Sequence, residues 1–264
     1  MSGYFPQLSS GALTQFPVQR SRRKRAIASV AEDGTYYALA DSGASWLRWQ
    51  LHYAGLSDAE AGTLATFFEQ NEGRGGSFLF ADPGANLLVQ SEALGDAVWV
   101  RNALLTLRAG SVDPLLTNRA ATLTNTSPAA LTMAQSMNLP GAVTACFSAY
   151  LRCAAAGPVQ LTRNDGATTV TQPFALRPEW QRFALRSTIA GGAGPCTFLL
   201  TIAAGYAVDV FGFQVSAQTA AGQYVATAAT GGLYPATSFD SDELLIARTD
   251  YNQNSCQVHL ISRA

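Results

Sequence analysis

The sequence has few charged residues, and it has no long apolar run. Charged residues make up 13% of the 264 residues and the formal net charge is -1. Neither a disordered chain nor a generally basic nucleic-acid-binding protein fits these values. No stretch approaches the roughly 18 to 20 apolar residues that span a bilayer, and the first residues lack the layout of a signal peptide. We expect a soluble, unsecreted globular protein with no membrane insertion.

Histidine and cysteine are also scarce, and their spacing gives no metal-binding pattern. The four cysteines form no C-x-x-C pair, and neither His52 nor His259 lies at metal-ligand spacing. Asp165 and Asp209 could contribute to a calcium site, but no acidic cluster supplies the roughly six to eight oxygens that it needs. We therefore predict no metal and no cofactor. We also predict buried free thiols, consistent with synthesis in a reducing cytoplasm.

The first third of the chain combines strand patterns with one helix. Asp33-Gly34 lies between two strand-like runs, which is typical of a β-hairpin. The run Trp46–Tyr53 alternates, with Leu47, Trp49, Leu51 and Tyr53 on one face. Ser57-Asp58-Ala59-Glu60 is a capping box, so we expect a helix to follow it. The residues before Gln15 lack periodicity and are expected to form an extended arm. That arm either lies over a neighbouring subunit or caps its own sheet.

After Pro83-Gly84 the pattern changes to short β-like runs with turn residues between them and no amphipathic helix. This spacing is typical of a two-sheet sandwich, and a jelly roll is the simplest arrangement. The strands expected are residues 143–151, 159–163, 168–174, 180–187, 197–203 and 207–217.

The last segment, residues 242–264, reads as a closing hairpin that is too small to be stable alone. It should therefore pair with the first part of the chain. We predict a mainly β protein with a discontinuous domain, residues 1–85 and 232–264, and an inserted β-sandwich, residues 86–231.

Several motifs at the two ends of the chain resemble one family. They are Leu13-Thr14-Gln15-Phe16-Pro17, Phe80-Ala81-Asp82-Pro83, Leu233-Tyr234-Pro235 and Phe239-Asp240-Ser241-Asp242-Glu243-Leu244. Together they resemble the minor tail or distal-tail hub proteins of long-tailed bacteriophages and prophages. The resemblance implies a tail-tube-like β-sandwich or barrel with one flanking helix. It also implies a homo-oligomeric ring, most often a hexamer, at the baseplate hub of the virion tail tip. The partners would be tail-tube and tail-tip proteins, and assembly would take place in the cytoplasm of the bacterial host.

The predicted insert carries its own resemblance. Asn86–Glu92, Phe147–Arg152, Trp180–Phe183 and Val210–Val215 resemble carbohydrate-binding-module-like sandwiches, of the galactose-binding-like type, on phage tail and fibre proteins. The chain departs from that pattern at Ala226, where the family often has proline. The resemblance implies host attachment through weak binding of surface polysaccharide. Aromatic residues would form the platform for the sugar, and we name Tyr150 and Tyr206 as candidate glycan contacts. Trp99 and Trp180 are expected in the core.

One dense basic run stands out, formed by Arg20, Arg22, Arg23, Lys24 and Arg25. It is either a solvated loop leading into a strand, or a patch that faces the lumen or a neighbouring subunit. In the second case it would meet an acidic neighbour or make non-specific contact with DNA phosphate.

No catalytic constellation accompanies these features. The acidic residues of the insert are scattered, whereas glycoside cleavage needs two facing carboxyl groups. The two histidines lie beside no nucleophile motif. We therefore expect a non-enzymatic virion structural protein. The alternative left open is a stand-alone, lectin-like carbohydrate-binding protein without ring assembly.

Overall fold

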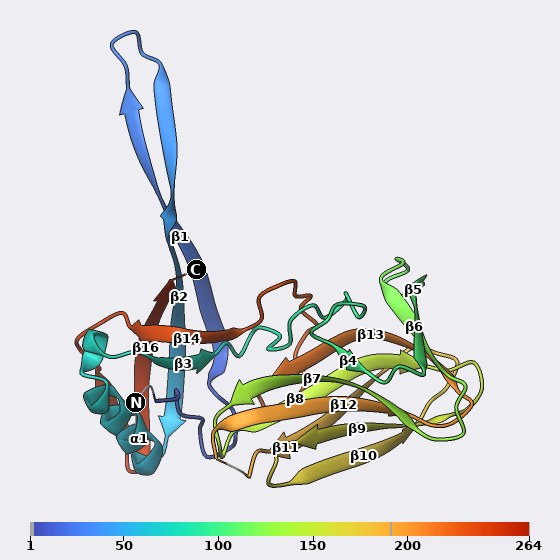
Figure 1. Ribbon diagram of the computed structural model, residues 1–264. Helices are drawn as coiled ribbons and strands as arrows, with labels where there is room; N and C mark the ends of the chain where they lie inside the picture. The colour runs from blue at the N-terminus through green and yellow to red at the C-terminus, as the bar shows by residue number, and fades with distance from the viewer. Residues whose placement is uncertain (1–2, 191, 264) are drawn as a thin grey trace. The chain divides into compact units, whose positions relative to one another are not determined.

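The computed structural model describes residues 3–190 and 192–263, and these form a mainly β protein, as predicted. They divide into two compact units, which the chain joins through several crossings. The first unit comprises residues 3–9, 13–81 and 233–263, and the second comprises residues 10–12 and 82–232. Each unit has its own sheets and its own interior (Figure 1).

The first unit is one antiparallel sheet with a helix against it (Figure 1). The strand order is β1-β2-β16-β14-β3, and β15 pairs with β16 on a branch. Strand β16, near the end of the chain, pairs with β2, which is the pairing expected for the closing hairpin. The bounds are β1 Gln15–Val30, β2 Tyr36–Leu56, α1 Asp58–Gln70, the 3-10 turn η1 Gly73–Gly75, β3 Phe78–Ala81, β14 Leu233–Phe239, β15 Ile246–Asp250 and β16 Gln253–Arg263.

The interior of this unit is built from aromatic rings contributed by distant parts of the chain. Trp49 on β2 lies edge-on to Phe80 on β3, with centroids 5.1 Å apart, and the ring of Phe5 is 5.6 Å from that of Phe80. Phe5 and Leu13 are both buried in this core. The residues before β1 therefore cap their own sheet, which was one of the two alternatives for the arm.

Helix α1 begins at the predicted capping box. The hydroxyl of Ser57 accepts from the amide of Glu60, and the Glu60 carboxylate accepts from the amide of Ser57 at 3.0 Å. Two of the otherwise unpaired groups at the helix start are thereby satisfied. Ala61 and Leu64 are the buried residues of the helix.

The second unit consists of two antiparallel five-stranded sheets, ordered β10-β9-β12-β7-β4 and β11-β8-β13-β6-β5 (Figure 1). Phe147 on β8 and Phe198 on β12 meet across the interior, 5.4 Å apart, as in a β-sandwich. The bounds are β4 Val100–Arg101, β5 Leu105–Ser111, β6 Ala120–Asn125, β7 Leu131–Leu139, β8 Thr144–Arg152, β9 Pro158–Asn164, β10 Thr169–Ala175, β11 Gln181–Thr188, β12 Gly194–Ile202 and β13 Ala207–Ser216.

The structure departs from the prediction at three places. Strands β4, β5, β6 and β7 were not predicted. The predicted hairpin around Asp33-Gly34 is confirmed, but its second strand and the strand Trp46–Tyr53 form one element, the 21-residue strand β2. Likewise, the basic run is no loop, because it lies within the 16-residue strand β1.

Candidate functional site

One face of the sheet β11-β8-β13-β6-β5 carries aromatic rings beside charged and hydroxyl side chains. Successive residues of a strand point to opposite faces. On β8, Phe147, Ala149 and Leu151 are buried in the interior of the sandwich, so Tyr150 and Arg152 lie on the opposite face. We call this opposite face the platform face.

A polar row crosses four strands of the platform face. Arg152 on β8 donates through Nε to Oδ2 of Asp209 on β13 at 2.9 Å. Thr122 on β6 donates to the other carboxylate oxygen of Asp209 at 2.6 Å, and its hydroxyl is 2.7 Å from that of Ser111 on β5. At the other end of the row, the guanidinium of Arg152 lies 4.7 Å from the ring centroid of Trp180. The row thus begins with an aromatic ring and continues through charged and hydroxyl groups.

A second row, next to the first, alternates cations with aromatic rings. The guanidinium of Arg182 lies 5.3 Å from the ring centroid of Tyr150, and the rings of Tyr150 and Phe211 are 6.1 Å apart. The guanidinium of Arg119 lies 5.3 Å from the Phe211 ring, and the ring of Tyr224 is 5.2 Å from it. Arginine stacks on aromatic rings because its planar cation interacts favourably with their π faces.

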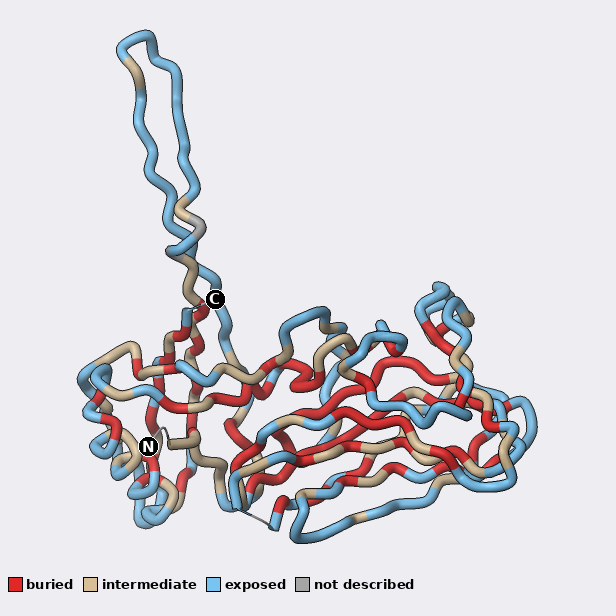
Figure 2. Tube along the Cα trace, in the orientation of Figure 1, coloured by how far each residue is buried: buried red, intermediate tan, exposed pale blue. Residues whose placement is uncertain are grey.

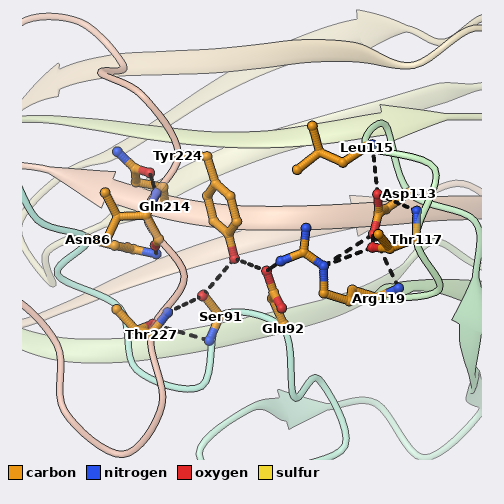
Figure 3. A network of polar contacts seen from close by, with 11 residues as sticks. Asn86, Ser91, Glu92, Asp113, Leu115, Thr117, Arg119, Gln214, Tyr224 and Thr227 are labelled. Carbon is orange, nitrogen blue, oxygen red and sulfur yellow. Dashed lines mark hydrogen bonds and ion pairs between the residues drawn. The ribbon is translucent and has the colours of Figure 1, made fainter.

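A hydrogen-bond network holds the segment around Tyr224 on this face (Figure 3). The Tyr224 hydroxyl is 2.9 Å from that of Ser91 and donates to the Glu92 carboxylate at 3.1 Å. Arg119 donates to the same Glu92 oxygen at 3.1 Å and pairs with Asp113 at 3.4 Å. Burial raises the pKa of Tyr224 well above its ordinary value, so the phenol stays protonated and can donate. The network therefore fixes one border of the platform face.

Tyr150 and Tyr206, which the sequence analysis named as candidate glycan contacts, lie in different surroundings. Tyr150 is half-buried on the platform face, between Arg182 and Phe211. Tyr206 follows β12 and lies against Gly157, where an added Cβ would meet its ring at 2.5 Å. No ring contact joins Tyr206 to Tyr150 within the described chain. Trp99 is a core residue, as expected, with its ring 5.1 Å from that of Phe213. Trp180 was also expected in the core, and this was wrong, because it is only half-buried and its ring lies against Arg152 on the platform face.

Sequence reasoning missed the partners of Tyr150. The i, i+2 spacing of Tyr150 and Arg152, and of Asp209 and Phe211, is a signal for two side chains on one face. It cannot say that β8 and β13 are neighbours, which is what aligns the two pairs. Both acids once considered for calcium are engaged with arginines, Asp209 with Arg152 and Asp165 with Arg163. Among residues 3–190 and 192–263, no group of three or more potential metal ligands occurs.

The basic run lies along the hairpin of β1 and β2 in the first unit. Arg20 is at its inner end, where it donates to the Tyr234 hydroxyl at 2.8 Å and lies 5.9 Å from the Trp49 ring centroid. Arg22 is exposed. Arg23, Lys24 and Arg25 line a hollow at the base of the projecting part of the hairpin. We call this hollow the basic hollow. Its lining is Arg23, Lys24, Arg25, Ala26, Trp46, Arg48 and Ile261.

Beyond the basic hollow the hairpin continues with almost no buried residues (Figure 2). Its two strands pair only with each other from Lys24 opposite Ser45 to Val30 opposite Tyr36. Five large apolar side chains in this part are each at least 59% exposed, namely Ile27, Val30, Tyr36, Tyr37 and Leu39. We call residues 26–30 and 36–40 the apolar ribbon. No helix among the described residues is long and apolar enough to cross a membrane.

No protein-family model and no curated protein matches the sequence. Among solved structures, the enzymatically active domain of tailspike protein 4 of bacteriophage CBA120 is similar at a TM-score of 0.42 and 12% identity, over 52% of this chain and 22% of that one. TmCBM61, solved in complex with β-1,4-galactotriose, is similar at 0.41 and 13% identity, over 49% of this chain and 97% of that one.

The CBM22-1 xylan-binding domain of Paenibacillus barcinonensis Xyn10C is similar at a TM-score of 0.41 and 15% identity, over 54% of this chain and 99% of that one. The chain therefore spans less than a quarter of the tailspike structure but nearly the full length of the two binding modules. Because these TM-scores lie below 0.5, the likenesses carry no functional argument.

Proposed function

We propose that this chain is a non-enzymatic structural protein of a long-tailed phage, which assembles as a ring at the distal tail and carries a glycan-binding sandwich. The observation that carries the proposal is the apolar ribbon. A two-stranded hairpin alone in water is at best marginally stable, and here no other described part of the chain covers either face of the apolar ribbon. A neighbouring copy would supply the missing cover. The open edge of the sheet at β1 adds unpaired backbone groups for the same neighbour.

Placement at a phage tail is supported by the motifs at both ends of the chain. Phe80-Ala81-Asp82-Pro83 and Leu233-Tyr234-Pro235 lie at the borders of the sandwich, and the strands that carry them are paired, Ala81 opposite Leu233. In a tail hub the neighbours would be tail-tube and tail-tip proteins, and the basic run would be available for non-specific contact with DNA in the lumen. We propose the virion tail tip as its location on the same grounds.

Glycan binding by the sandwich is supported by the platform face. Aromatic rings present apolar faces on which a sugar ring can stack, and neighbouring arginine, aspartate and hydroxyl groups can hydrogen-bond its hydroxyls. Trp180 and Tyr150 are half-buried and supply such rings, and Arg152 and Asp209 supply polar groups beside them. The same observation favours the second candidate, a stand-alone carbohydrate-binding protein. The two differ in assembly, because a lone lectin needs no ring.

The mass of the purified protein in solution separates these candidates. A ring-forming hub is expected at a multiple of the 27.9 kDa chain mass by multi-angle light scattering. In the matched variant, residues 25–44 are replaced by Asn-Gly, which joins Lys24 to its cross-strand partner Ser45 through a two-residue turn. This variant should fold and remain a monomer. A wild-type chain that is monomeric at all accessible concentrations would leave the lectin as the better account.

The domain organisation has its own test. Residues 86–231 can be replaced by a short turn, because the chain ends on either side of them lie next to each other. Asp82 donates from its amide to the carbonyl of Gly232 at 2.8 Å. We expect the shortened chain to keep the β1-β2-β16-β14-β3 sheet and a cooperative unfolding transition. An unfolded product would refute the split-domain organisation.

A further inference from the structure

The projecting hairpin carries opposite charges at its two ends. At the turn, Glu32 and Asp33 are both exposed. At the base, the basic hollow contains three arginines and a lysine. Two of these cations are compensated within the chain, since Arg25 pairs with Asp41 and Arg48 with Asp240.

Arg23 and Lys24 are different from those two. Neither has an ion-pair partner among residues 3–190 and 192–263, and both are exposed. The hollow therefore has two uncompensated positive charges, and the turn has two negative ones. The Asp33 carboxylate accepts from the amide of Thr35 at 2.9 Å, and this hydrogen bond lowers the pKa of Asp33, so this carboxylate stays ionised at neutral pH.

We infer that the acidic turn of one copy docks in the basic hollow of a second copy, and that the apolar ribbon is buried along the same contact. The inference rests on the proposed ring assembly and names the contact that would close it. The partner is thus another copy of this chain, bound through its residues Arg23 and Lys24.

The turn cannot reach the hollow of its own chain. Strand β1 runs six positions from Lys24 to Val30, which at about 3.3 Å per residue span about 20 Å, and the turn lies beyond Val30. Backbone pairing with β2 holds this stretch extended, with one bulge between Lys24 and Arg25. The complementary charges can therefore meet only between chains.

The contact is heterologous when the turn of each copy docks in the hollow of the next copy, while its own hollow receives the turn of the previous one. Repeated about an axis, such a contact closes a ring when the rotation per subunit divides a full turn. The ribbon suits close packing along this contact. Ala26, Ala28, Ala38 and Ala40 lie on one face of it, opposite each other in pairs, and they let a neighbouring backbone approach closely.

The other face of the ribbon presents the larger side chains Ile27, Leu39 and Tyr37. Buried against a neighbour, they would add apolar area to the charge contact. A nucleic acid fits this hairpin less well, because phosphate would meet the cations but would leave the apolar ribbon uncovered and would be repelled by the acidic turn.

Charge reversal tests the contact in the full-length chain. The turn variant is Glu32→Lys with Asp33→Asn, since asparagine keeps the acceptor for the Thr35 amide. The hollow variant is Arg23→Glu with Lys24→Glu. Each alone is expected to shift the mass measured by light scattering to that of the 27.9 kDa monomer, and the combined variant is expected to restore the assembly. The control Glu69→Lys reverses an exposed charge on α1 and should leave the mass unchanged.

A second measurement keeps the test independent of stability. The double variant Lys24→Cys with Glu32→Cys cannot form an internal bridge, since about 20 Å of strand β1 lies between them and disulfides need Cα atoms within about 7 Å. The four native cysteines are buried and should not interfere. Mild oxidation with copper phenanthroline should give a ladder of linked chains on a non-reducing gel. Lys24→Cys with Glu69→Cys is the mismatched control and should give none.

The outcomes separate this inference from the ring itself. If the wild-type protein assembles, but the charge-reversal variants keep the assembled mass and the double-cysteine variant gives no ladder, the docking contact is overturned and the ring is retained. A monomeric wild-type chain removes both. Binding of a 20-base-pair DNA duplex that is abolished by the hollow variant, with assembly unaffected, assigns the cations to phosphate and overturns the inference.

Discussion

Removing the carboxylate of Asp165 should strongly destabilise the sandwich, because it leaves a buried cation unpaired. Arg163 on β9 is only 1% exposed. Its guanidinium donates to Asp165 Oδ2 at 2.5 Å, to Thr168 Oγ1 at 2.8 Å and to the Thr188 carbonyl at 2.8 Å. Breaking a buried ion pair from one side costs about 3–5 kcal/mol. Asp165→Ala should therefore lower the free energy of unfolding of this unit by about that amount.

The free energy of unfolding should partly recover when both charges of this pair are removed. Replacing a buried pair by apolar groups is often close to neutral, so Arg163→Met with Asp165→Ala should be more stable than Asp165→Ala alone. Urea titration followed by tryptophan fluorescence measures this, with Trp99 and Trp180 reporting on the sandwich. Glu179→Ala removes an exposed acid in the same unit and should change stability by no more than about 0.5 kcal/mol. A loss below about 1 kcal/mol for Asp165→Ala would refute the argument.

Three further outcomes can be checked. Tyr150→Ala should weaken binding to surface polysaccharide about tenfold, or about 1.4 kcal/mol, in affinity electrophoresis, while Tyr206→Ala leaves it unchanged; equal losses would contradict the platform face. A hydrogen bond from Ser9, together with those from Ser57, lowers the pKa of Glu60 from 4.5 to about 2, so its contribution to stability is present above pH 4.5 and is lost as pH falls toward 2. Glu60→Gln should flatten the unfolding profile in that window, whereas an unchanged profile would show that this carboxylate is not responsible. Burial raises the pKa of the Cys196 thiol to about 12, so iodoacetamide at pH 8 should modify it only after unfolding, as mass spectrometry would show.

Local patterns in the sequence were sufficient wherever neighbouring residues determine the structure. The capping box at Ser57 and Glu60 predicts where α1 begins, since both of its hydrogen bonds lie within one turn. The alternation of Leu47, Trp49, Leu51 and Tyr53 identifies the buried face of β2. The last six strands of the sandwich, β8 to β13, also follow from their periodicity.

Other features depend on partners that a linear pattern does not reveal. The sequence predicts the hairpin that forms the apolar ribbon, but not that its large apolar side chains are exposed, because a local pattern does not show whether another part of the chain covers a strand. Strand β7 was missed because a polar residue, Gln135, is buried within it. The Gln135 side chain accepts from the amide of Val89 and donates to the carbonyl of Val89, both at 2.9 Å. The ion pair between Arg152 and Asp209 joins residues 57 positions apart in the sequence, and only the pairing of β8 with β13 brings them together.

The pairing of β3 with β14, on either side of the sandwich in the sequence, bears on how proteins with this scaffold could diversify. Since Ala81 and Leu233 already lie opposite each other, whatever connects them acts as an oversized hairpin loop of the first sheet. Loop-closure entropy grows only with the logarithm of loop length, and each doubling adds about 0.6 kcal/mol. A different folded module, or a simple turn, could therefore occupy this position at little thermodynamic penalty. The junction is a natural exchange point at which one scaffold could acquire new binding modules without redesign of its own interior.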